Sequence, residues 1–312
     1  MIQIYGAGMA GSFLFMLLRD QEKVKIFDVR KVVDCRCAWG IAYRQAKKLY
    51  KLIGVDLDEY VLSKPELAVA NGIEMKNLNI VTFDRRRLLQ DLWRELDFGE
   101  VKADLRVDAT GVARAYLPPI ANDRIYYCVQ SVERFEADEN VYAYAVKTGY
   151  AWAFPLGDGR WHVGAGDTSY ERAAALVEKL KDFYGFGGDA ACSCRARIRM
   201  LPPSRCRPFV AANTVGVGEA IGCVSGFGEG NAPSLECAKI LAEEILDGEL
   251  RRYEERVIEN FRWIELEHEF VEAVQIGRKL SALLKLPRVM MIERRRSASM
   301  TPRLVSLIRR LI

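Results

Sequence analysis

The sequence predicts an α/β protein with a Rossmann-like nucleotide-binding domain, an inserted antiparallel β-sheet domain and a C-terminal helical segment. Three observations predict this class. A short apolar strand at the N-terminus runs into a glycine-rich turn and a helix. Short, aromatic, alternating strands interrupt the α/β pattern between residues 126 and 166. From residue 249 onward the pattern is charged and helical.

The chain has 312 residues, half of them hydrophobic, which is enough to bury more than one core. We expect the nucleotide-binding domain to comprise residues 1–115 and 205–250. The inserted sheet, expected to carry the substrate site, takes residues 116–204, and the helical segment takes residues 251–312.

The charge and hydropathy of the chain exclude several classes. A dispersed net charge of +4 does not suit nucleic acid, and we expect no such partner. No apolar stretch approaches the ~20 residues of a membrane-spanning helix. Because the first strand begins at residue 2, no room is left for a signal peptide. We therefore expect a cytoplasmic protein, soluble or peripheral to a membrane.

The N-terminal turn has the glycine spacing of a dinucleotide fingerprint. Met1-Ile-Gln-Ile-Tyr5 runs into Gly6-Ala-Gly8-Met-Ala-Gly11, which is G-x-G-x-x-G between a strand and a helix. Gly6 permits the tight turn, Gly8 lets the backbone approach a pyrophosphate, and Gly11 permits close packing of helix on strand. The helix that follows presents free N–H groups to the phosphates.

A second strand over residues 23–27 ends at Asp28, twenty residues after Gly8. An acidic side chain in this position accepts hydrogen bonds from a ribose diol. The fingerprint alone leaves open whether the nucleotide is NAD(P) or FAD.

Further elements follow in order. Residues 42–53 predict a basic helix, residues 59–75 short strands and residues 79–83 a strand. Asp84 then caps a helix with leucines at 88, 89 and 92. A strand over residues 105–108 ends abruptly at the small-residue turn Ala109-Thr110-Gly111.

The aromatic region predicts an antiparallel sheet. Gly157-Asp158-Gly159 is a strong hairpin signal, and a helix over 171–184 and a strand near 195–200 follow. Tyr150, Trp152 and Phe154 alternate along one strand, so their side chains share one face. On spacing alone, this face is more typical of a sheet core than of a ligand site.

A late glycine-rich region covers residues 215–231, before a helix over 233–246. Its glycines imitate a second dinucleotide site, but no second strand with a terminal acid follows at the right distance. We interpret Gly218-Glu219 as the end of a strand and Gly228-Glu229-Gly230-Asn231 as a loop at a helix N-terminus. Such a loop can present N–H groups to electron-rich ring atoms.

Together these motifs resemble the flavoproteins with the para-hydroxybenzoate hydroxylase type of FAD fold. Within that group, Tyr150-Ala-Trp152-Ala-Phe154-Pro155 matches the Y-x-W-x-F-P motif of the geranylgeranyl reductase family. Residues 218–222 and 228–230 resemble that family's G-D-A-x-G and G-x-G stretches, and Cys37-Ala38-Trp39-Gly40 its cysteine–glycine segment. The resemblance spans residues 1–250.

The sequence also departs from the family pattern. Glu219 replaces the customary aspartate, and Asp28 stands where FAD proteins more often have glutamate. Ala38 and Trp39 replace the usual glycine neighbour of Cys37.

The resemblance implies FAD as cofactor, with NAD(P)H or a ferredoxin-like carrier as reductant. It places Tyr150, Trp152, Phe154 and Pro155 on the wall of a cavity for a prenyl chain. Arg85 would lie near the cofactor, although the basic start of its helix also suits a solvated charge. The implied FAD contacts are Gly6, Gly8, Met9, Ala10, Gly11, Asp28, Val29, Arg85, Ala109, Thr110, Gly111, Gly218, Glu219, Gly228, Glu229, Gly230 and Asn231.

No side chain is an obvious proton donor. Cys37 is a candidate catalytic residue by position, with an inert buried thiol as the alternative. Of the two histidines, we expect His162 to be structural and His268 to face solvent on a charged helix. The eight cysteines include two C-x-C pairs rather than the C-x-x-C of metal knuckles, so we expect no metal site.

The C-terminal residues 302–312 predict a basic amphipathic helix. It would either lie on an anionic lipid surface or pack against the protein or a dimer partner.

Three functions remain open from sequence. The first is an FAD-dependent reductase of carbon–carbon double bonds in geranylgeranyl chains of an isoprenoid lipid, by hydride transfer from reduced flavin. The second is an FAD-dependent monooxygenase of an aromatic substrate. The third is a non-catalytic flavin- or lipid-binding protein.

Overall fold

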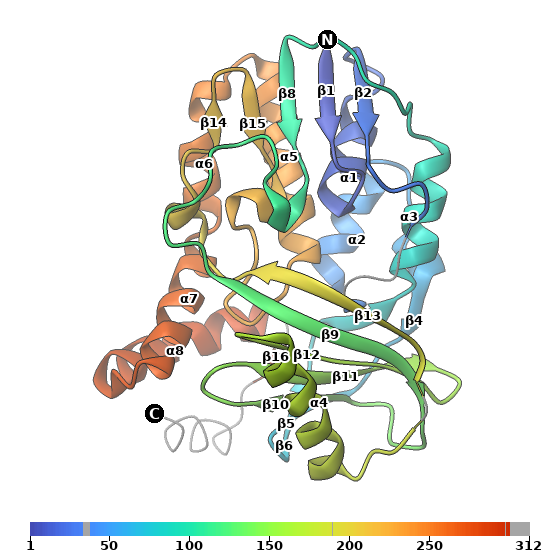
Figure 1. Cartoon of the computed structure of the whole chain (residues 1–312), viewed down its shortest axis with the longest axis vertical. Helices are drawn as coiled ribbons and strands as arrows, with labels where there is room; N and C mark the ends of the chain where they lie inside the picture. Colours follow the sequence, from blue (N-terminus) through green and yellow to red (C-terminus); the bar gives the residue numbers. More distant parts are fainter. Residues whose placement is uncertain (34–37, 189, 297, 300–312) are drawn as a thin grey trace.

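The computed structural model describes residues 1–33, 38–188, 190–296 and 298–299. Two sheets lie one above the other in Figure 1, and helices pack against one face of each. The upper sheet has the strand order β14-β15-β8-β1-β2 and the lower one β13-β9-β12-β11-β10-β5-β6-β16. A small sheet, β3-β7-β4, adjoins them. The α/β prediction is confirmed.

The upper sheet is parallel except at β14. Its strands are β1 (Ile2–Tyr5), β2 (Val24–Phe27), β8 (Leu105–Asp108), β15 (Thr214–Gly216) and β14 (Val210–Ala211). In register, Tyr5 pairs with both Phe27 and Asp108, so these three strands end together. The turns predicted to bind the nucleotide therefore meet at one edge of the sheet.

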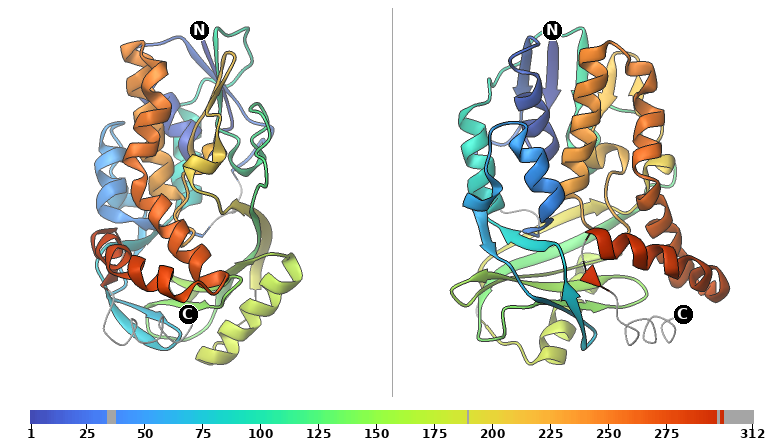
Figure 2. Two further views of the ribbon diagram at one scale, coloured as in Figure 1. Left: turned by 90° about the vertical axis from the view of Figure 1, so that its left-hand side faces the viewer. Right: turned by 180° about the vertical axis from the view of Figure 1, so that it is seen from behind.

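Helices α1 and α5 pack beside one another against the upper sheet, as the rear view in Figure 2 shows. Helix α1 begins directly after the fingerprint and is buried along nine of its ten residues. The helices of this half are α1 (Met9–Leu18), α2 (Tyr43–Lys51), α3 (Arg85–Arg94), α5 (Asn231–Asp247) and α6 (Tyr253–Asn260). Short 3₁₀ turns are η1 (Leu57–Tyr60), η2 (Gly111–Ala113), η3 (Pro203–Cys206), η4 (Gly218–Ile221) and η5 (Leu250–Arg252).

The lower sheet is antiparallel except where β10 runs parallel to β5. Its strands are β9 (Ile125–Arg134), β10 (Val141–Ala145), β11 (Tyr150–Gly157), β12 (Arg160–Asp167), β13 (Ala190–Arg199), β5 (Leu67–Ala70), β6 (Ile73–Asn77) and β16 (Ala298–Ser299). The small sheet consists of β3 (Gly40–Ala42), β4 (Val61–Ser63) and β7 (Ile80–Phe83). The inserted strands are thus joined by β5 and β6 from the range predicted for the first domain.

Helix α4 (Tyr170–Tyr184) covers one face of the lower sheet. Ala151 and Ala153 of β11 pack in the core under α4, together with Trp161 and Val163. Because neighbouring residues of a strand point to opposite faces, Tyr150, Trp152 and Phe154 point the other way, toward the upper half. The prediction that they share one face is confirmed, and that face is not the one packed on α4.

The C-terminal segment forms α7 (Arg262–Gln275) and α8 (Lys279–Arg296), which pack on each other. Pro287 lies inside α8, so the helix continues past the residue that usually interrupts one. Cys37 and the helix predicted over residues 302–312 lie outside the described residues.

Candidate functional site

The fingerprint glycines have distinct steric roles. A Cβ on Gly6, which has φ +102°, would lie 2.4 Å from the Ala109 carbonyl oxygen. A Cβ on Gly11 would lie 1.9 Å from the Gly6 carbonyl oxygen. A Cβ on Gly8 would meet nothing within 4 Å, although Gly8 is the N-cap of the buried helix α1. Gly6 and Gly11 therefore permit packing, and Gly8 leaves open space before a helix N-terminus, which fits a pyrophosphate.

Asp28 follows β2 and is buried. Its carboxylate accepts from the Ala7 N–H (2.7 Å) and from the backbone N–H, Nε and Nη2 of Arg30 (2.8, 2.8 and 2.6 Å). Burial opposes ionisation, but the hydrogen bonds and charge of Arg30 outweigh it and hold the pKa of Asp28 below its usual value. All four lone-pair positions are thus in use. A ribose diol would reach Asp28 only if Arg30 released it.

A surface pocket of about 440 Å³ opens beside Asp28. Trp93 of α3 contributes one wall, donates Nε1–H to the Ala7 carbonyl (2.8 Å) and packs edge-on against Phe98. Two aromatic rings next to a strand-end acid suit a flat base such as adenine. The sequence predicted the apolar stripe of α3 but not this pocket. Val29, which was predicted to contact FAD, is 82% exposed and does not line the pocket. The lining residues are Ile26, Phe27, Asp28, Arg30, Lys31, Trp93, Phe98, Gly99 and Glu100.

The Ala109-Thr110-Gly111 turn is held by the buried Asp108. The Asp108 carboxylate accepts from the Thr110 N–H and hydroxyl (3.0 and 2.6 Å) and from the N–H groups of Tyr116 and Leu117. The turn is therefore fixed from within the protein, next to the glycine fingerprint.

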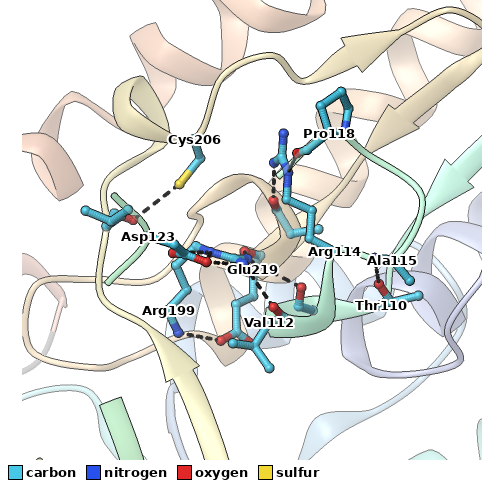
Figure 3. A network of polar contacts seen from close by, with 12 residues as sticks. Thr110, Val112, Arg114, Ala115, Pro118, Asp123, Arg199, Cys206 and Glu219 are labelled. Carbon is cyan, nitrogen blue, oxygen red and sulfur yellow. Dashed lines mark hydrogen bonds and ion pairs between the residues drawn. The ribbon is translucent and has the colours of Figure 1, made fainter. Parts of the chain in front are cut away.

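Glu219 belongs to a polar network at the junction of the two halves (Figure 3). Its Oε1 accepts from the Arg199 backbone N–H (2.8 Å). Burial raises the pKa of Glu219, against the lowering effect of hydrogen bonds from the Arg199 and Val112 N–H groups. The carboxylate thus faces the end of β13 and the turn at Val112.

Arg199 at the end of β13 was not singled out by the sequence. Its guanidinium donates to the carbonyls of Val112 and Glu219 (both 2.9 Å) and to the carboxylate of Asp123. Arg114 likewise donates to the carbonyls of Ala220, Pro118 and Pro208. Only the fold brings these turns together, so no local sequence signal marks either arginine.

The N-terminal glycine fingerprint and the late glycine-rich region lie next to each other. A Cβ on Gly218, which has φ +68°, would lie 3.0 Å from Ala10 Cβ on α1. Residues 225–230 then form a tight loop in which the Ser225 hydroxyl accepts from the Phe227 and Glu229 N–H groups. This loop leads into the N-terminus of α5.

The Glu229 side chain points from this loop toward α5 and α8. Its Oε1 accepts from the Ala232 N–H (3.0 Å), and its Oε2 lies 3.9 Å from Arg296 Nη2. Burial raises the pKa of Glu229 to about 7, although Arg296 acts against this shift. Glu229 is thus a carboxyl group that titrates near neutral pH.

The C-terminal helices hold this loop in place. Glu267 of α7 is fully buried and accepts from the Gly226 N–H (3.1 Å). His268 Nε2 donates to the Val224 carbonyl (2.9 Å), and burial lowers the pKa of His268 to about 4. The expectation that His268 faces solvent is wrong, because the glycine-rich loop packs over that side of α7.

Tyr150, Trp152 and Phe154 each contact a different neighbour. A Cβ on Gly228 would lie 1.7 Å from the Tyr150 hydroxyl oxygen, and one on Gly40 would lie 3.0 Å from the Phe154 ring. Trp152 Nε1 donates to His162 Nδ1 (3.3 Å). The aromatic strand therefore adjoins both the late glycine loop and β3. Pro155 is buried, and its carbonyl accepts from the Thr82 hydroxyl (2.6 Å).

His162 lies opposite Phe154 on the same face of the sheet. Burial lowers its pKa to about 4, so the ring is neutral at neutral pH, with Nδ1 as acceptor and the proton on Nε2. The Trp39 ring is 5.9 Å from the His162 ring, and its buried Nε1 has no hydrogen-bond partner among the described residues. A buried unpaired N–H is costly, which is consistent with a ligand acceptor at this point.

Asn231 connects the α5 N-terminus to the same place, since its Nδ2 donates to the Gly40 carbonyl (2.9 Å). Arg85 is buried at the first position of α3. Within the described residues, no three His, Cys, Asp or Glu side chains are grouped as metal ligands.

No family model matches the chain. Among curated proteins it is similar to an uncharacterised protein of Methanocaldococcus jannaschii, at 23% identity over 88% of this chain and 92% of that one. It is also similar to the menaquinone reductase of Mycolicibacterium smegmatis, at 29% identity over 47% of this chain and 37% of that one.

Two solved structures extend the comparison. One is a geranylgeranyl bacteriochlorophyll reductase-like protein of Thermoplasma acidophilum, with a TM-score of 0.74 and 15% identity over 100% of this chain and 95% of that one. The other is PqsL, a probable FAD-dependent monooxygenase of Pseudomonas aeruginosa, with a TM-score of 0.66 and 15% identity over 92% and 99%. The fold is therefore the FAD-binding fold of the para-hydroxybenzoate hydroxylase type, shared by reductase-like proteins and monooxygenases.

Proposed function

We propose that this protein is an FAD-dependent reductase that saturates carbon–carbon double bonds in the geranylgeranyl chains of an isoprenoid lipid. The observation that carries the proposal is the position of Tyr150, Trp152 and Phe154. Their side chains lie on the sheet face away from α4, and Tyr150 touches the glycine loop at Gly228. An isolated alkene offers few polar handles, so an aromatic surface next to the cofactor loop suits it.

The residues that would hold FAD are those of the converging turns. Gly8 and the N-terminus of α1 would receive the pyrophosphate, and the pocket beside Trp93 would receive the adenine. Residues 228–231 would adjoin the isoalloxazine ring. Bound and reduced, the flavin would supply a hydride to one alkene carbon, and a proton that comes ultimately from solvent would be added to the neighbouring carbon.

The chain's own residues would orient the alkene and exclude water from it. Trp152, held by His162, would present a fixed ring face to the prenyl chain. Trp39 Nε1, a buried donor with no hydrogen-bond partner among the described residues, would bind an oxygen of the lipid head group. The relatives named for menaquinone reduction and geranylgeranyl reduction support an isoprenoid substrate. The electron donor in this proposal is NAD(P)H or a ferredoxin-like carrier.

The test is turnover by Trp152 variants. Trp152→Ala should lower the rate of double-bond reduction at least about tenfold, because alkene positioning is lost, while flavin content stays unchanged. Trp152→Phe should recover part of the rate. Mass spectrometry of a geranylgeranyl lipid incubated with reduced protein measures this directly. Equal rates for the wild type and Trp152→Ala would rule out the aromatic surface as the substrate site.

A flavin monooxygenase acting on an aromatic substrate is the second candidate, favoured by the similarity to PqsL. It would consume oxygen in step with reductant, whereas a reductase would add two hydrogens per double bond under anaerobic conditions. A protein that holds flavin and does neither would be the non-catalytic binding protein.

A further inference from the structure

The outward face of α8 is unusually apolar for a surface helix. Five large apolar side chains on this helix and the turn before it are exposed, between 38% and 72%. They are Ile276, Leu280, Leu283, Leu284 and Met291. Leu280, Leu284 and Met291 follow one another at spacings of four and seven residues, so they form a single stripe. Exposed apolar patches of this kind mark interaction surfaces.

This stripe is not needed for the packing of α8 on α7. The inward face of α8, with Ala282, Leu286 and Val289, already packs on Phe270 and Ala273 of α7. Figure 1 shows the α7–α8 hairpin running outward from the body of the molecule, with its turn at the outer end. The outward stripe is therefore accessible to a partner.

Positive charge surrounds the stripe. Arg278, Lys279, Arg288, Arg294 and Arg295 are exposed, and the described residues offer them no ion pair. Residues 276–296 contain seven basic residues and one acidic residue, Glu293. The net charge of the whole chain is only +4, so the remainder of the chain is net negative. The positive charge is thus concentrated on this helix.

We infer that the outward face of α8 is a docking surface for an anionic lipid bilayer. Apolar side chains flanked by arginine and lysine match the boundary between acyl chains and acidic head groups. Seven basic residues against one acidic residue over 276–296 make the helix complementary in charge to acidic head groups, and this favours a lipid surface over a protein partner. None of the described helices is long and apolar enough to cross the bilayer, so the contact is interfacial.

Docking here would place the α7–α8 hairpin at the lipid surface. The α7–α8 hairpin contacts the glycine loop through Glu267 and Gly226. The inference does not require the proposed reaction, because binding to vesicles is measured without turnover.

The experiment is vesicle co-sedimentation of the full chain at two salt concentrations. Wild type should bind phosphatidylglycerol-containing vesicles with an affinity that falls at high salt, and it should not bind vesicles of pure phosphatidylcholine. The triple variant Leu280→Ser/Leu284→Ser/Met291→Ser should bind at least about tenfold more weakly. Arg288→Gln/Arg294→Gln/Arg295→Gln should bind on the order of 100-fold more weakly, since each basic residue contributes roughly fivefold near an anionic surface.

Two further variants make the result specific. Leu52→Ser/Phe183→Ser removes exposed apolar side chains elsewhere (54% and 51%) and should bind like wild type. Arg303→Gln/Arg309→Gln/Arg310→Gln alters the C-terminal segment and should leave binding through α8 in place. The inference is overturned if the α8 variants bind like wild type, if the C-terminal variant alone abolishes binding, or if α8 instead mediates a dimer that Leu284→Ser dissolves in sedimentation velocity.

Discussion

At the scale of single residues, three glycines in one motif have different tasks. Gly6 and Gly11 sit where a Cβ would strike a backbone oxygen, so they are required for the strand–turn–helix to form. Gly8 has free space around its Cα and a negative φ of −81°. The lack of a side chain at Gly8 therefore keeps space open for a ligand at the N-terminus of α1.

Alanine substitution should separate these tasks. Gly11→Ala places Cβ 1.9 Å from the Gly6 oxygen and should lower the free energy of unfolding by at least about 3 kcal/mol. Gly8→Ala should change stability by less than about 1 kcal/mol yet reduce flavin binding, because its methyl group enters the phosphate space. Urea denaturation and flavin titration of both variants measure this. A Gly8→Ala protein that binds flavin like wild type would contradict the pyrophosphate assignment.

Other residue-level features could not be read from sequence. The strand-end acid Asp28 was predicted, but its capture by Arg30 depends on a side-chain conformation that no spacing rule describes. His268 sits in a charged helix, and only the packing of residues 224–226 on that helix buries it. Polar residues buried by tertiary contacts look like surface residues in sequence.

At the scale of elements, the loop over residues 225–230 is shaped by the helices on both sides of it. Glu229 caps the start of α5 through the Ala232 N–H and faces Arg296 of α8. Glu236 also pairs with Arg296, and Glu293 lies close by. Arg296 thus lies near several carboxylates. Its positive charge therefore compensates only part of the negative charge that Glu229 gains when it ionises.

This arrangement predicts a pH-dependent stability term. Because the folded-state pKa of Glu229 is raised to about 7, the folded protein binds more protons than the unfolded chain between about pH 4.5 and 7. The stabilising contribution is complete below that window and is lost as pH rises through it. Glu229→Gln keeps an acceptor for Ala232 but cannot ionise.

Relative to wild type, Glu229→Gln should therefore gain about 2 kcal/mol in unfolding free energy between pH 5 and pH 8. Urea denaturation at both pH values measures the gain. Glu259→Gln, a 74% exposed side chain on α6, is the control for removal of a surface charge. An equal effect of Glu229→Gln at both pH values would count against the raised pKa.

Most elements were predictable because their signals are local. Strand β8 and helix α3 match their predicted positions, with Asp84 accepting from the Arg87 N–H at the cap. Strand pairing was harder: β5 joins the inserted sheet through a parallel pairing with β10, more than seventy residues away in sequence. Pro287 also did not end α8, since that helix is held by its inward apolar side chains.

At the scale of the whole molecule, the candidate site lies where the two sheets approach each other. The glycine turns come from the upper sheet and the aromatic strand from the lower one (Figure 1). The local motifs predicted each half of the site, and the resemblance to known flavoproteins indicated that they belong together. What holds them together is polar and nonlocal, and it centres on Arg199 of β13.

Arg199 should therefore control both the stability of the fold and its hold on flavin. Arg199→Met removes the buried guanidinium that donates to Asp123 and to the carbonyls of Val112 and Glu219, and the loss of these hydrogen bonds should cost about 2–3 kcal/mol. Because the displaced turns are those predicted to contact the cofactor, flavin should also dissociate more readily. Arg199→Lys should recover little of either, since an ammonium cannot reproduce the planar fork.

The matched control is Arg197→Met, an exposed arginine two residues away on the same strand, which should change stability by less than about 0.5 kcal/mol. Urea denaturation followed by tryptophan fluorescence, together with flavin retention after gel filtration, reports both effects. If Arg199→Met unfolds at the same urea concentration as Arg197→Met, the network around Glu219 does not join the two halves. If it is destabilised but retains flavin like wild type, the turns at Val112 and Glu219 stabilise the fold without shaping the cofactor site.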